Sequence, residues 1–334
     1  MKKIIITGGA GYIGSHSVVE LLNAGYEPII FDNFSNSSYL NLEGIKKICN
    51  INSLNFHLLD CTDFNAMNEV VNQYDNVEAL IHFAAFKSVA ESVKNPNKYY
   101  SNNVNSMKNV IKLCKLHNIN KLIFSSSCTV YGQPEKLPVD ETTKFGIPPS
   151  PYAETKQICE ELLQQSNLNS VSLRYFNPIG SHETSLIGDL SDDNLTNLVP
   201  IMTAVAAGER KELLIFGNDY NTKDGSCIRD YIHVQDLALS HVKALDFLCS
   251  NTGKFIFNIG TGNGLSVFEA IDIFENSNNI SLNKKVVERR DGDVESIFSS
   301  CDKANTILGW KAKFSVEKAM IDAWNWEKNK QKLD

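Results

Sequence analysis

Three glycines between an apolar strand and a helix constrain this 334-residue chain more than any other feature. Residues 3–7 read KIIIT, a β-branched run typical of a buried parallel strand. GGAGYIGSH follows, with Gly8, Gly11 and Gly14 in a GxxGxxG spacing. SVVELLNAGY then carries its apolar residues on one helical face, and PIIFDN predicts a second strand that ends at Asp32. The order strand, glycine turn, helix, strand indicates a β-α-β unit.

Each glycine of this turn has a physical role in binding a dinucleotide. A side chain at Gly8 or Gly11 would obstruct the tight turn or the approach of a pyrophosphate, and one at Gly14 would push the helix off the strand. The helix N-terminus offers free backbone N–H groups and a partial positive charge to phosphates. Asp32 is placed to accept both hydroxyls of an adenosine ribose and would repel a 2′-phosphate. The unit therefore predicts binding of NAD rather than NADP.

The alternation of strands and helices continues beyond this unit. We expect a third strand that ends near Asp60, a helix over residues 64–74, a fourth strand over 79–85, a mostly helical segment over 96–117 and a fifth strand that ends in serines. Such repeats indicate an α/β fold with a Rossmann-type doubly wound parallel sheet. Ligands of these sheets lie at the carboxyl ends of the strands. The residues expected there are Asp32, Asp60, 83–87 and 125–127.

Composition excludes several classes of protein. Apolar residues make up 43% of the chain and charged residues 21%, which is typical of a globular enzyme. The net charge is −7 and no long basic stretch occurs, so we expect no nucleic-acid partner. The eight cysteines form no CxxC pair and no Cys/His cluster with metal-ligand spacing, which predicts reduced thiols, no metal site and a cytoplasmic protein. No apolar stretch is long enough for a transmembrane helix, so no membrane partner is expected.

A tyrosine and a lysine four residues apart, Tyr152 and Lys156, share one face of a predicted helix. Alone, such a pair is usually a surface feature, but Ser127 at the end of the fifth strand and a cofactor over the sheet change the context. Removing a hydride from an alcohol carbon requires a base for the hydroxyl proton. An ammonium and a positive nicotinamide both lower the pKa of a phenol. We therefore predict Tyr152 as the base, Lys156 as the charge that also holds the cofactor ribose, and Ser127 as the hydrogen-bond partner of the reacting oxygen.

Ten ordered blocks of sequence resemble the extended short-chain dehydrogenases/reductases and, more closely, the UDP-glucose 4-epimerase family. They are TGGAGYIGSH, DNFSNS, HFAAFKSVAESV, YYSNNV, FSSSCTVYG, SPYAETK, LRYFNPIG, IFGNDY, IRDYIHVQDLA and RRDGD, and they extend over nearly the whole chain. The resemblance implies reversible C4 epimerisation of UDP-galactose and UDP-glucose with tightly bound NAD. NAD takes the C4 hydride while Tyr152 takes the hydroxyl proton, and the 4-keto sugar then turns over and receives the hydride on its other face.

The resemblance also assigns site residues. On the cofactor side they are Gly8, Gly11, Tyr12, Ile13, Gly14, Asp32, Asn33, Asn36, Ser37, Asp60, Cys61, Phe83, Ala84, Ala85, Lys87, Asn102, Lys156 and Phe176. On the substrate side they are Ser127, Asn177, Asn197, Leu198, Phe216, Arg229, Arg290, Asp293 and Ile297. From the residues alone, Arg229 and Arg290 would be surface ion pairs with the neighbouring Asp230 and Asp291. The resemblance instead favours contacts with a diphosphate, which invites bidentate guanidinium binding.

The implied organisation is a Rossmann-type NAD-binding domain over residues 1–176, with returns near 228–262. A smaller C-terminal α/β domain that binds the UDP-sugar takes up most of residues 177–334. The resemblance further implies a homodimer built on the helices over residues 96–117 and 152–163. Its small-molecule partner would be a UDP-hexose.

Other functions remain possible. A nucleotide-sugar 4,6-dehydratase also begins by oxidising C4, but such enzymes place an Asp-Glu pair where this chain has Cys128 and Thr129, and neither of these is a competent general acid. A sensor that binds NAD without catalysis would not need Ser127, Tyr152 and Lys156. Both classes are disfavoured.

Three positions depart from or vary within the family pattern. Ile297 resembles a gate for 2-acetamido sugars and is intermediate in size, so UDP-N-acetylhexosamines and UDP-pentoses remain alternative substrates, with plain hexoses preferred. Ala153-Glu154 adds a methyl and a charge beside the base, and helical geometry points Glu154 away from it. Ala85 stands where a glycine is common, and a methyl there is tolerable.

Overall fold

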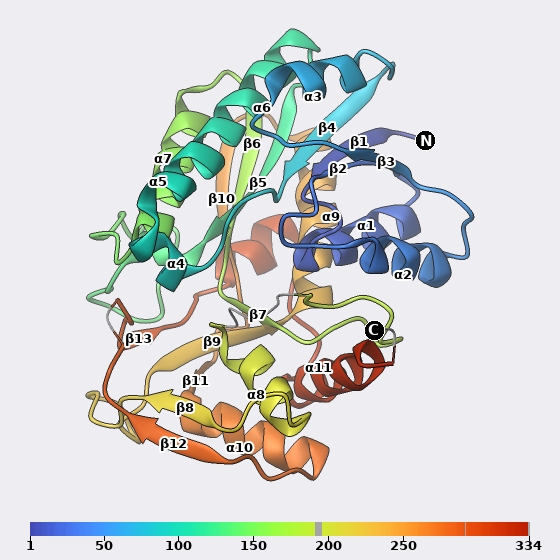
Figure 1. Cartoon of the computed structure of the whole chain (residues 1–334). Helices are drawn as coiled ribbons and strands as arrows, with labels where there is room; N and C mark the ends of the chain where they lie inside the picture. The colour runs from blue at the N-terminus through green and yellow to red at the C-terminus, as the bar shows by residue number, and fades with distance from the viewer. Residues whose placement is uncertain (191–195, 291, 333–334) are drawn as a thin grey trace.

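The computed structural model describes residues 1–190, 196–290 and 292–332, and its centre is a large parallel sheet with helices on both faces (Figure 1). The strands are β1 Lys3–Thr7, β2 Glu27–Asp32, β3 Asn55–Leu58, β4 Val77–His82, β5 Lys121–Ser127, β6 Asn169–Tyr175, β7 Asn177–Ile179, β8 Leu213–Phe216, β9 Ile228–His233, β10 Lys254–Ile259, β11 Gly264–Ser266, β12 Lys284–Val287 and β13 Ser296–Ile297.

The helices differ in type as well as in length. The α-helices are α1 Tyr12–Asn23, α2 Tyr39–Cys49, α3 Phe64–Val71, α4 Val89–Lys94, α5 Pro96–Tyr99, α6 Asn105–Leu116, α7 Pro151–Gln165, α8 Leu198–Ala206, α9 Val234–Ser250, α10 Val267–Asn278 and α11 Val316–Lys330. The other helical segments are the π-helical η1 Tyr100–Val104 and η3 Ala304–Leu308 and the 3₁₀-helical η2 Cys128–Tyr131.

The seven-stranded sheet has the order β10-β6-β5-β4-β1-β2-β3, and all its neighbouring strands are parallel. The strand order reverses between β1 and β4, since the chain moves outward from β1 in one direction through β2 and β3 and in the other through β4 to β6. This is the Rossmann-type doubly wound arrangement, so the predicted fold class is confirmed. A ligand crevice is expected at the carboxyl ends of β1 and β4, where the order reverses.

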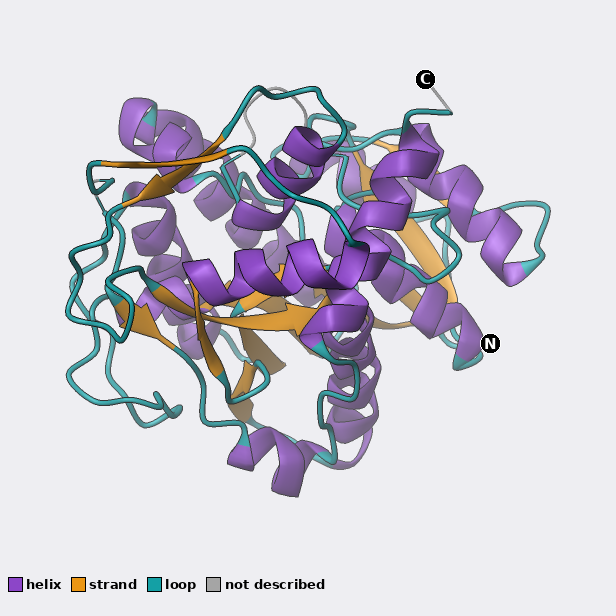
Figure 2. Ribbon diagram, turned by 90° about the horizontal axis from the view of Figure 1, so that it is seen from below, coloured by secondary structure: helices purple, strands orange, loops and turns teal. Residues whose placement is uncertain are grey.

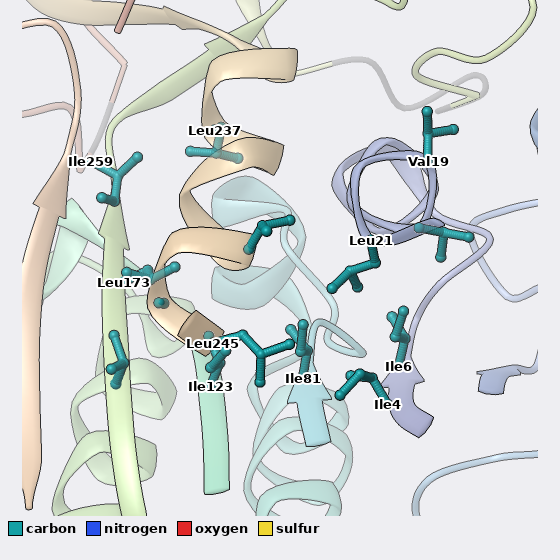
Figure 3. Packing of buried hydrophobic residues seen from close by; sticks show 14 of the residues in the cluster. Ile4, Ile6, Val19, Leu21, Ile81, Ile123, Leu173, Leu237, Leu245 and Ile259 are labelled. Carbon is teal, nitrogen blue, oxygen red and sulfur yellow. The ribbon is translucent and has the colours of Figure 1, made fainter. Parts of the chain in front are cut away.

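The β-branched run of β1 is buried on both faces of this sheet. Ile4 and Ile6 belong to a core that α1 and α9 cover, and Figure 3 shows their side chains near Leu21 of α1 and Leu245 of α9. Ile5 points to the opposite face, where side chains of α3, α6 and α7 form a second core. Successive side chains of a strand point to opposite faces, so only a continuous apolar run can fill both cores.

A second, smaller group of elements follows β6. Strand β9 pairs with β7, β11 and β13, and β8 pairs with β12. Helices α8, α10 and α11 pack there on a core that includes Met202, Phe274 and Met320. This group lies below the large sheet in Figure 1, so it is the part nearest the viewer in the view from below (Figure 2). The stretch predicted to return contributes to both groups, since β9 lies in the smaller sheet while α9 packs on α1 and β10 pairs with β6.

Four predicted elements differ in detail from the observed ones, and the first is helix α3, which ends at Val71 rather than at Tyr74. Strand β4 ends at His82 because the backbone N–H groups of Phe83 and Ala84 both turn to the carbonyl of Thr7. Strand β3 ends at Leu58, ahead of Asp60. The long segment over residues 96–117 is divided into α5, η1 and α6, and the π-helical turn in its middle presents Asn102 to the cavity described below.

Candidate functional site

A single cavity at the carboxyl ends of β1, β4 and β5 brings together every residue predicted to hold the cofactor. Those that line it are Gly8, Gly11, Tyr12, Ile13, Gly14, Asp32, Asn33, Asn36, Ser37, Asp60, Cys61, Phe83, Ala84, Ala85, Lys87, Asn102, Lys156 and Phe176. Ser127 and Tyr152 line the same cavity. The residues come from segments spread over the first half of the chain, so the doubly wound topology is what assembles them.

The glycine turn leaves room for a ligand and none for side chains. Gly8 has φ +72°, and a Cβ there would lie 2.8 Å from the amide nitrogen of Ala84. A Cβ on Gly14 would lie 2.1 Å from the carbonyl oxygen of Gly8, so α1 sits directly on the turn. Gly11 is the N-cap of α1, and no side chain caps that helix end. The uncapped N–H groups of the first turn suit a pyrophosphate.

Asp32 closes β2 beside this turn and organises the loop that follows. Its carboxylate accepts hydrogen bonds from the amide of Ala10 at 3.0 Å, the amide of Phe34 at 3.0 Å and the hydroxyl of Ser37 at 2.7 Å. A carboxylate has about four acceptor positions, so one is left, on Oδ2. Asp32 therefore fits one ribose hydroxyl as it stands, and accepting both would require Ser37 to turn away.

The lysine of the predicted catalytic pair reaches past the tyrosine to the sheet. Lys156 Nζ donates to the carbonyl oxygen of Ser125 at 2.6 Å and lies 5.8 Å from the ring centroid of Tyr152. Helix α7 carries both residues and begins at Pro151, and the hydroxyl of its N-cap residue Ser150 accepts from the amide of Ala153. The cap and the proline fix where α7 starts, and so place Tyr152 in its first turn next to the end of β5.

Burial controls the protonation of this pair. It raises the pKa of Tyr152 to about 12, against the hydrogen bond with Ser127, which lowers it. It lowers the pKa of Lys156 to about 8. We expected Lys156 to lower the pKa of the phenol, but desolvation raises it, and the lowering contribution comes from the hydrogen bond with Ser127. A positively charged nicotinamide ring in the cavity would add to the charge of Lys156 and favour the phenolate.

The carboxylate of Glu154, two residues after Tyr152, points away from the cavity. Glu154 is exposed and accepts a hydrogen bond from the hydroxyl of Tyr100 at 2.5 Å, as the helical geometry predicts. Ala153 is buried, and Ala85 lines the cavity. None of these three residues obstructs Tyr152.

A second cavity adjoins the first on the side of the smaller sheet. Of the residues predicted to bind substrate, it is lined by Asn177, Asn197, Leu198, Phe216, Arg229, Arg290 and Asp293. Asn177 and Asn197 line both cavities, as do Tyr12, Pro178 and Asp189. A ligand that extends from one cavity to the other would pass these shared residues.

One carboxylate lies between the two arginines of the second cavity. Arg290 donates to Asp293 through two nitrogens, at 2.8 and 3.1 Å, and its guanidinium lies 5.3 Å from the ring centroid of Phe216. Arg229 lies 3.9 Å from the same carboxylate. Asp230, the neighbour that could have paired with Arg229, instead accepts hydrogen bonds from Thr261, Gly262 and Ser299. Asp291, the neighbour of Arg290, lies outside the described residues.

Ile297 is the one predicted site residue that is not among the described residues lining either cavity. It is 3% exposed and belongs to a small core with Cys128 and Phe176, which do line the first cavity. The size of the Ile297 side chain can therefore affect a ligand through its effect on the positions of Cys128 and Phe176.

Sequence reasoning missed several residues of the two cavities. Asp189 lines both, yet it stands in a segment with no motif, so no local signal could have identified it. Tyr231 lines the second cavity two residues after Arg229 on β9. Residues two apart on a strand share a face, and that periodicity could have predicted it. Thr129 lines the first cavity, two residues after Ser127.

In the part of the chain that the structure describes, no group of three or more His, Cys, Asp or Glu side chains is placed to hold a metal ion. No helix there is long and apolar enough to cross a membrane. All eight cysteines are free thiols.

Known proteins with similar sequences and structures act on nucleotide sugars. The sequence profile of the GDP-mannose 4,6 dehydratase family matches residues 5–322. The chain is 42% identical to the UDP-glucose 4-epimerase of Haemophilus influenzae over 334 residues, covering 98% of each. It is similar to a UDP-glucose-4-epimerase from Stenotrophomonas maltophila with bound NAD and formylated UDP-arabinopyranose (TM-score 0.95, 38% identity, 100% of both chains). It is also similar to the UDP-glucose 4-epimerase from Bifidobacterium longum in complex with NAD+ and UDP (TM-score 0.95, 39% identity, 99% of both chains).

Proposed function

The chain belongs to the UDP-glucose 4-epimerase family of extended short-chain dehydrogenases/reductases, and from this premise we propose that it interconverts UDP-glucose and UDP-galactose. The enzyme inverts C4 of the sugar through a 4-keto intermediate and uses NAD. When bound, NAD supplies the oxidant that accepts a hydride from C4 and later returns it. The reaction is therefore an isomerisation with no net oxidation.

The observation that carries this proposal is the meeting of Ser127, Tyr152 and Lys156 on one wall of the dinucleotide-type cavity. Ser127 donates a hydrogen bond to the reacting oxygen and steadies it as it becomes a carbonyl. Tyr152 takes the hydroxyl proton and gives it back. Because burial holds the pKa of Tyr152 at about 12, the phenolate forms only when positive charge stands nearby. Lys156 supplies hydrogen bonds to the cofactor ribose and keeps its contact with Ser125.

The second cavity suits the UDP part of the substrate. Arg229 and Arg290 are the cations for its diphosphate, and Asp293, which lies between them, is the acceptor for ribose hydroxyls. Asn177 and Asn197 line both cavities and are placed where the sugar meets the nucleotide. This arrangement holds the UDP firmly and leaves the sugar free to present either face to Tyr152.

We assign plain hexoses as the preferred substrates. Ile297 is buried in the same small core as Cys128 and Phe176, which line the cofactor cavity, and a branched side chain of this size in that core supports exclusion of a 2-acetamido group. Comparing kcat/KM for UDP-galactose and UDP-N-acetylgalactosamine tests this assignment, and equal values would overturn it. UDP-pentoses are the second candidate, since the similar structure from Stenotrophomonas maltophila holds formylated UDP-arabinopyranose.

Elimination of water is disfavoured at this site. Burial raises the pKa of the Cys128 thiol to about 12, and the Thr129 hydroxyl is bonded to Ser127. Neither side chain can act as the general acid that a 4,6-dehydratase needs at these positions.

The test is to give the purified protein UDP-galactose with no added cofactor and to resolve the products by NMR. UDP-glucose should form, which would establish both the reaction and retained NAD. If turnover requires added NAD, the epimerase reaction is supported, but the prediction that the purified protein retains NAD is wrong. A 4-keto-6-deoxy sugar would identify a dehydratase instead, and no product even with added NAD would refute the proposal.

We further propose that the enzyme is a cytoplasmic homodimer whose substrate-binding part is mainly residues 177–334. Leu116 of α6 is an exposed apolar side chain, and Ile111 and Leu162 are only partly buried where they pack against the core, which supports a contact between copies at these helices. Light scattering coupled to gel filtration distinguishes a dimer from a monomer. Charged substitutions of Leu116 and Leu162 should dissociate the dimer if these helices form the interface.

A further inference from the structure

The end of β5 carries a hydrogen-bond arrangement that the assigned roles do not use. Ser127 is in extended conformation and serves as the N-cap of η2. Its Oγ accepts from the amide of Thr129 at 3.2 Å and from the hydroxyl of Thr129 at 3.0 Å. Of the described residues, Ser127 is the hydrogen-bond partner of the Thr129 hydroxyl. Both residues line the cofactor cavity.

These two contacts determine what Ser127 can still do. A serine hydroxyl has two acceptor positions and one proton. The amide of Thr129 can only donate, and when its hydroxyl donates as well, both acceptor positions of Ser127 are filled. The Ser127 proton is then directed away from Thr129 and into the cavity. In that direction the Ser127 hydroxyl forms its hydrogen bond with Tyr152. This hydrogen bond lowers the pKa of the phenol, which burial raises.

We propose that Thr129 is a positioning residue of the epimerase: by donating to Ser127 Oγ it makes Ser127 an obligate hydrogen-bond donor, whose single proton goes to the Tyr152 oxygen in the absence of substrate and to the reacting oxygen once substrate is bound. This inference rests on the proposed function and extends it. Thr129 touches neither reacting atom in this role. Its effect on catalysis passes entirely through Ser127.

The surroundings of Tyr152 define what else could alter its titration. The titratable groups that face it are Lys156 and Cys159 on α7, Cys128 on η2 and Tyr175 on β6. Thr129 carries no charge, so its replacement changes none of these groups. Any effect of Thr129 on the titration of Tyr152 must then pass through the Ser127 hydrogen bond.

The test compares Thr129→Val and Thr129→Ala, which remove the hydroxyl, with Thr129→Ser, which keeps it. Both hydroxyl-free variants should lose about tenfold in kcat, the equivalent of one neutral hydrogen bond, with KM for UDP-galactose nearly unchanged. Thr129→Ser should restore kcat. Thr142→Val is the matched control, since Thr142 donates through its amide and hydroxyl to Asp140 two residues earlier, outside both cavities. It should leave kcat unchanged.

Two further measurements separate positioning from a structural role. In a double-mutant cycle, Thr129→Val should have no further effect once Ser127 is Ala. Ultraviolet titration of the phenolate in the holoenzyme, with Tyr152→Phe as reference, should show a higher apparent pKa in Thr129→Val than in the wild type.

Several results would overturn the inference while leaving the epimerase assignment intact. They are an unchanged or raised kcat in both hydroxyl-free variants, additive effects in the cycle, or a Thr129→Ser variant as slow as Thr129→Val. A raised kcat would mean that the Thr129 hydroxyl accepts the hydrogen bond of the Ser127 proton, so that this proton is unavailable to Tyr152 and to the reacting oxygen. Absence of turnover in the wild-type enzyme would refute the proposed function itself.

Discussion

At the scale of single residues, burial sets the chemistry of the site. Burial shifts both Tyr152 and Lys156 toward the neutral form, with pKa values of about 12 and about 8. Near pH ~7 the phenol is therefore neutral while Lys156 is still mostly protonated, and the additional positive charge of an oxidised nicotinamide would favour the phenolate. Coupling proton removal to the oxidised cofactor in this way would limit side reactions when only the sugar or only the reduced cofactor is present.

Replacing the base should abolish turnover without abolishing binding. Tyr152→Phe removes one oxygen from the cavity wall, and the loss of general-base catalysis should lower kcat by about 10²–10⁴-fold. UDP affinity, measured by calorimetry, should stay near that of the wild type. Tyr39→Phe, at an exposed position on α2, is the control. A Tyr152→Phe enzyme within tenfold of wild-type kcat would contradict the assigned role.

The neighbouring arginines Arg289 and Arg290 offer a matched pair. Arg290→Met should raise KM for UDP-galactose about 10–100-fold, since hydrogen bonds to a charged group are lost. Arg289→Met should change KM little, because Arg289 pairs with Asp219 on the exposed surface. Steady-state kinetics of both variants checks the prediction. Equal effects would mean that general charge, rather than the contact of Arg290, attracts the substrate.

At the scale of elements, close packing of α1 on the glycine turn positions the phosphate site. The helix can approach because Gly14 lacks a Cβ, and the turn can form because Gly8 adopts a positive φ. Helix α7 is placed by a different device, the Ser150 cap and Pro151. The close contact of α1 with the glycine turn thus positions the phosphate end of the cofactor cavity, and the start of α7 positions the end that carries Tyr152.

Adding one methyl to α1 should separate the helix from the turn. Gly14→Ala places a Cβ against the Gly8 carbonyl, so the helix must move, and NAD content and Tm should both fall sharply. Gly25→Ala is the control, because its Cβ meets no atom within 4 Å and only the strained φ of +81° costs about 1 kcal/mol. Cofactor absorbance and thermal unfolding measure both effects. A Gly14→Ala protein with full NAD content would contradict the packing argument.

At the scale of the whole molecule, the cores on both faces of the sheet bury neutral histidines. Burial lowers the pKa of His16 and His82 to about 3 and that of His241 to about 4. The unfolded chain binds a proton on each of them near pH ~6.5, whereas the folded chain does not. The unfolded state therefore binds more protons throughout this interval.

Stability should consequently fall as the solution is acidified. Between about pH 6.5 and 4 each of these histidines lowers the free energy of unfolding by about 1.4 kcal/mol per pH unit, and the loss is absent above pH ~6.5. Thermal unfolding across this range measures the slope, and His82→Asn should reduce it by about 1.4 kcal/mol per pH unit, the contribution of one histidine. A constant Tm between pH 7 and 5 would show that these histidines are not buried in the neutral form.

Local patterns were sufficient for the fold class and for the cofactor cavity. The run Ile4–Ile6, the glycine spacing and the acid at Asp32 are short-range features whose meaning depends on little beyond their own β-α-β unit. The residues carried over by resemblance converge on two adjoining cavities, apart from Ile297. Asp189 could not be found in this way, because it reaches the site from an irregular segment without periodicity.

The order of residues along the chain determined which groups are available: a phenol four residues before an amine, a serine at a strand end, and a glycine turn before a helix. Only the tertiary structure decided how those groups behave. It directed Lys156 to the Ser125 carbonyl and placed Asp293 between two arginines. The physical reason is that dielectric environment and hydrogen-bond direction depend on every neighbour in space, and most of those neighbours are distant in sequence.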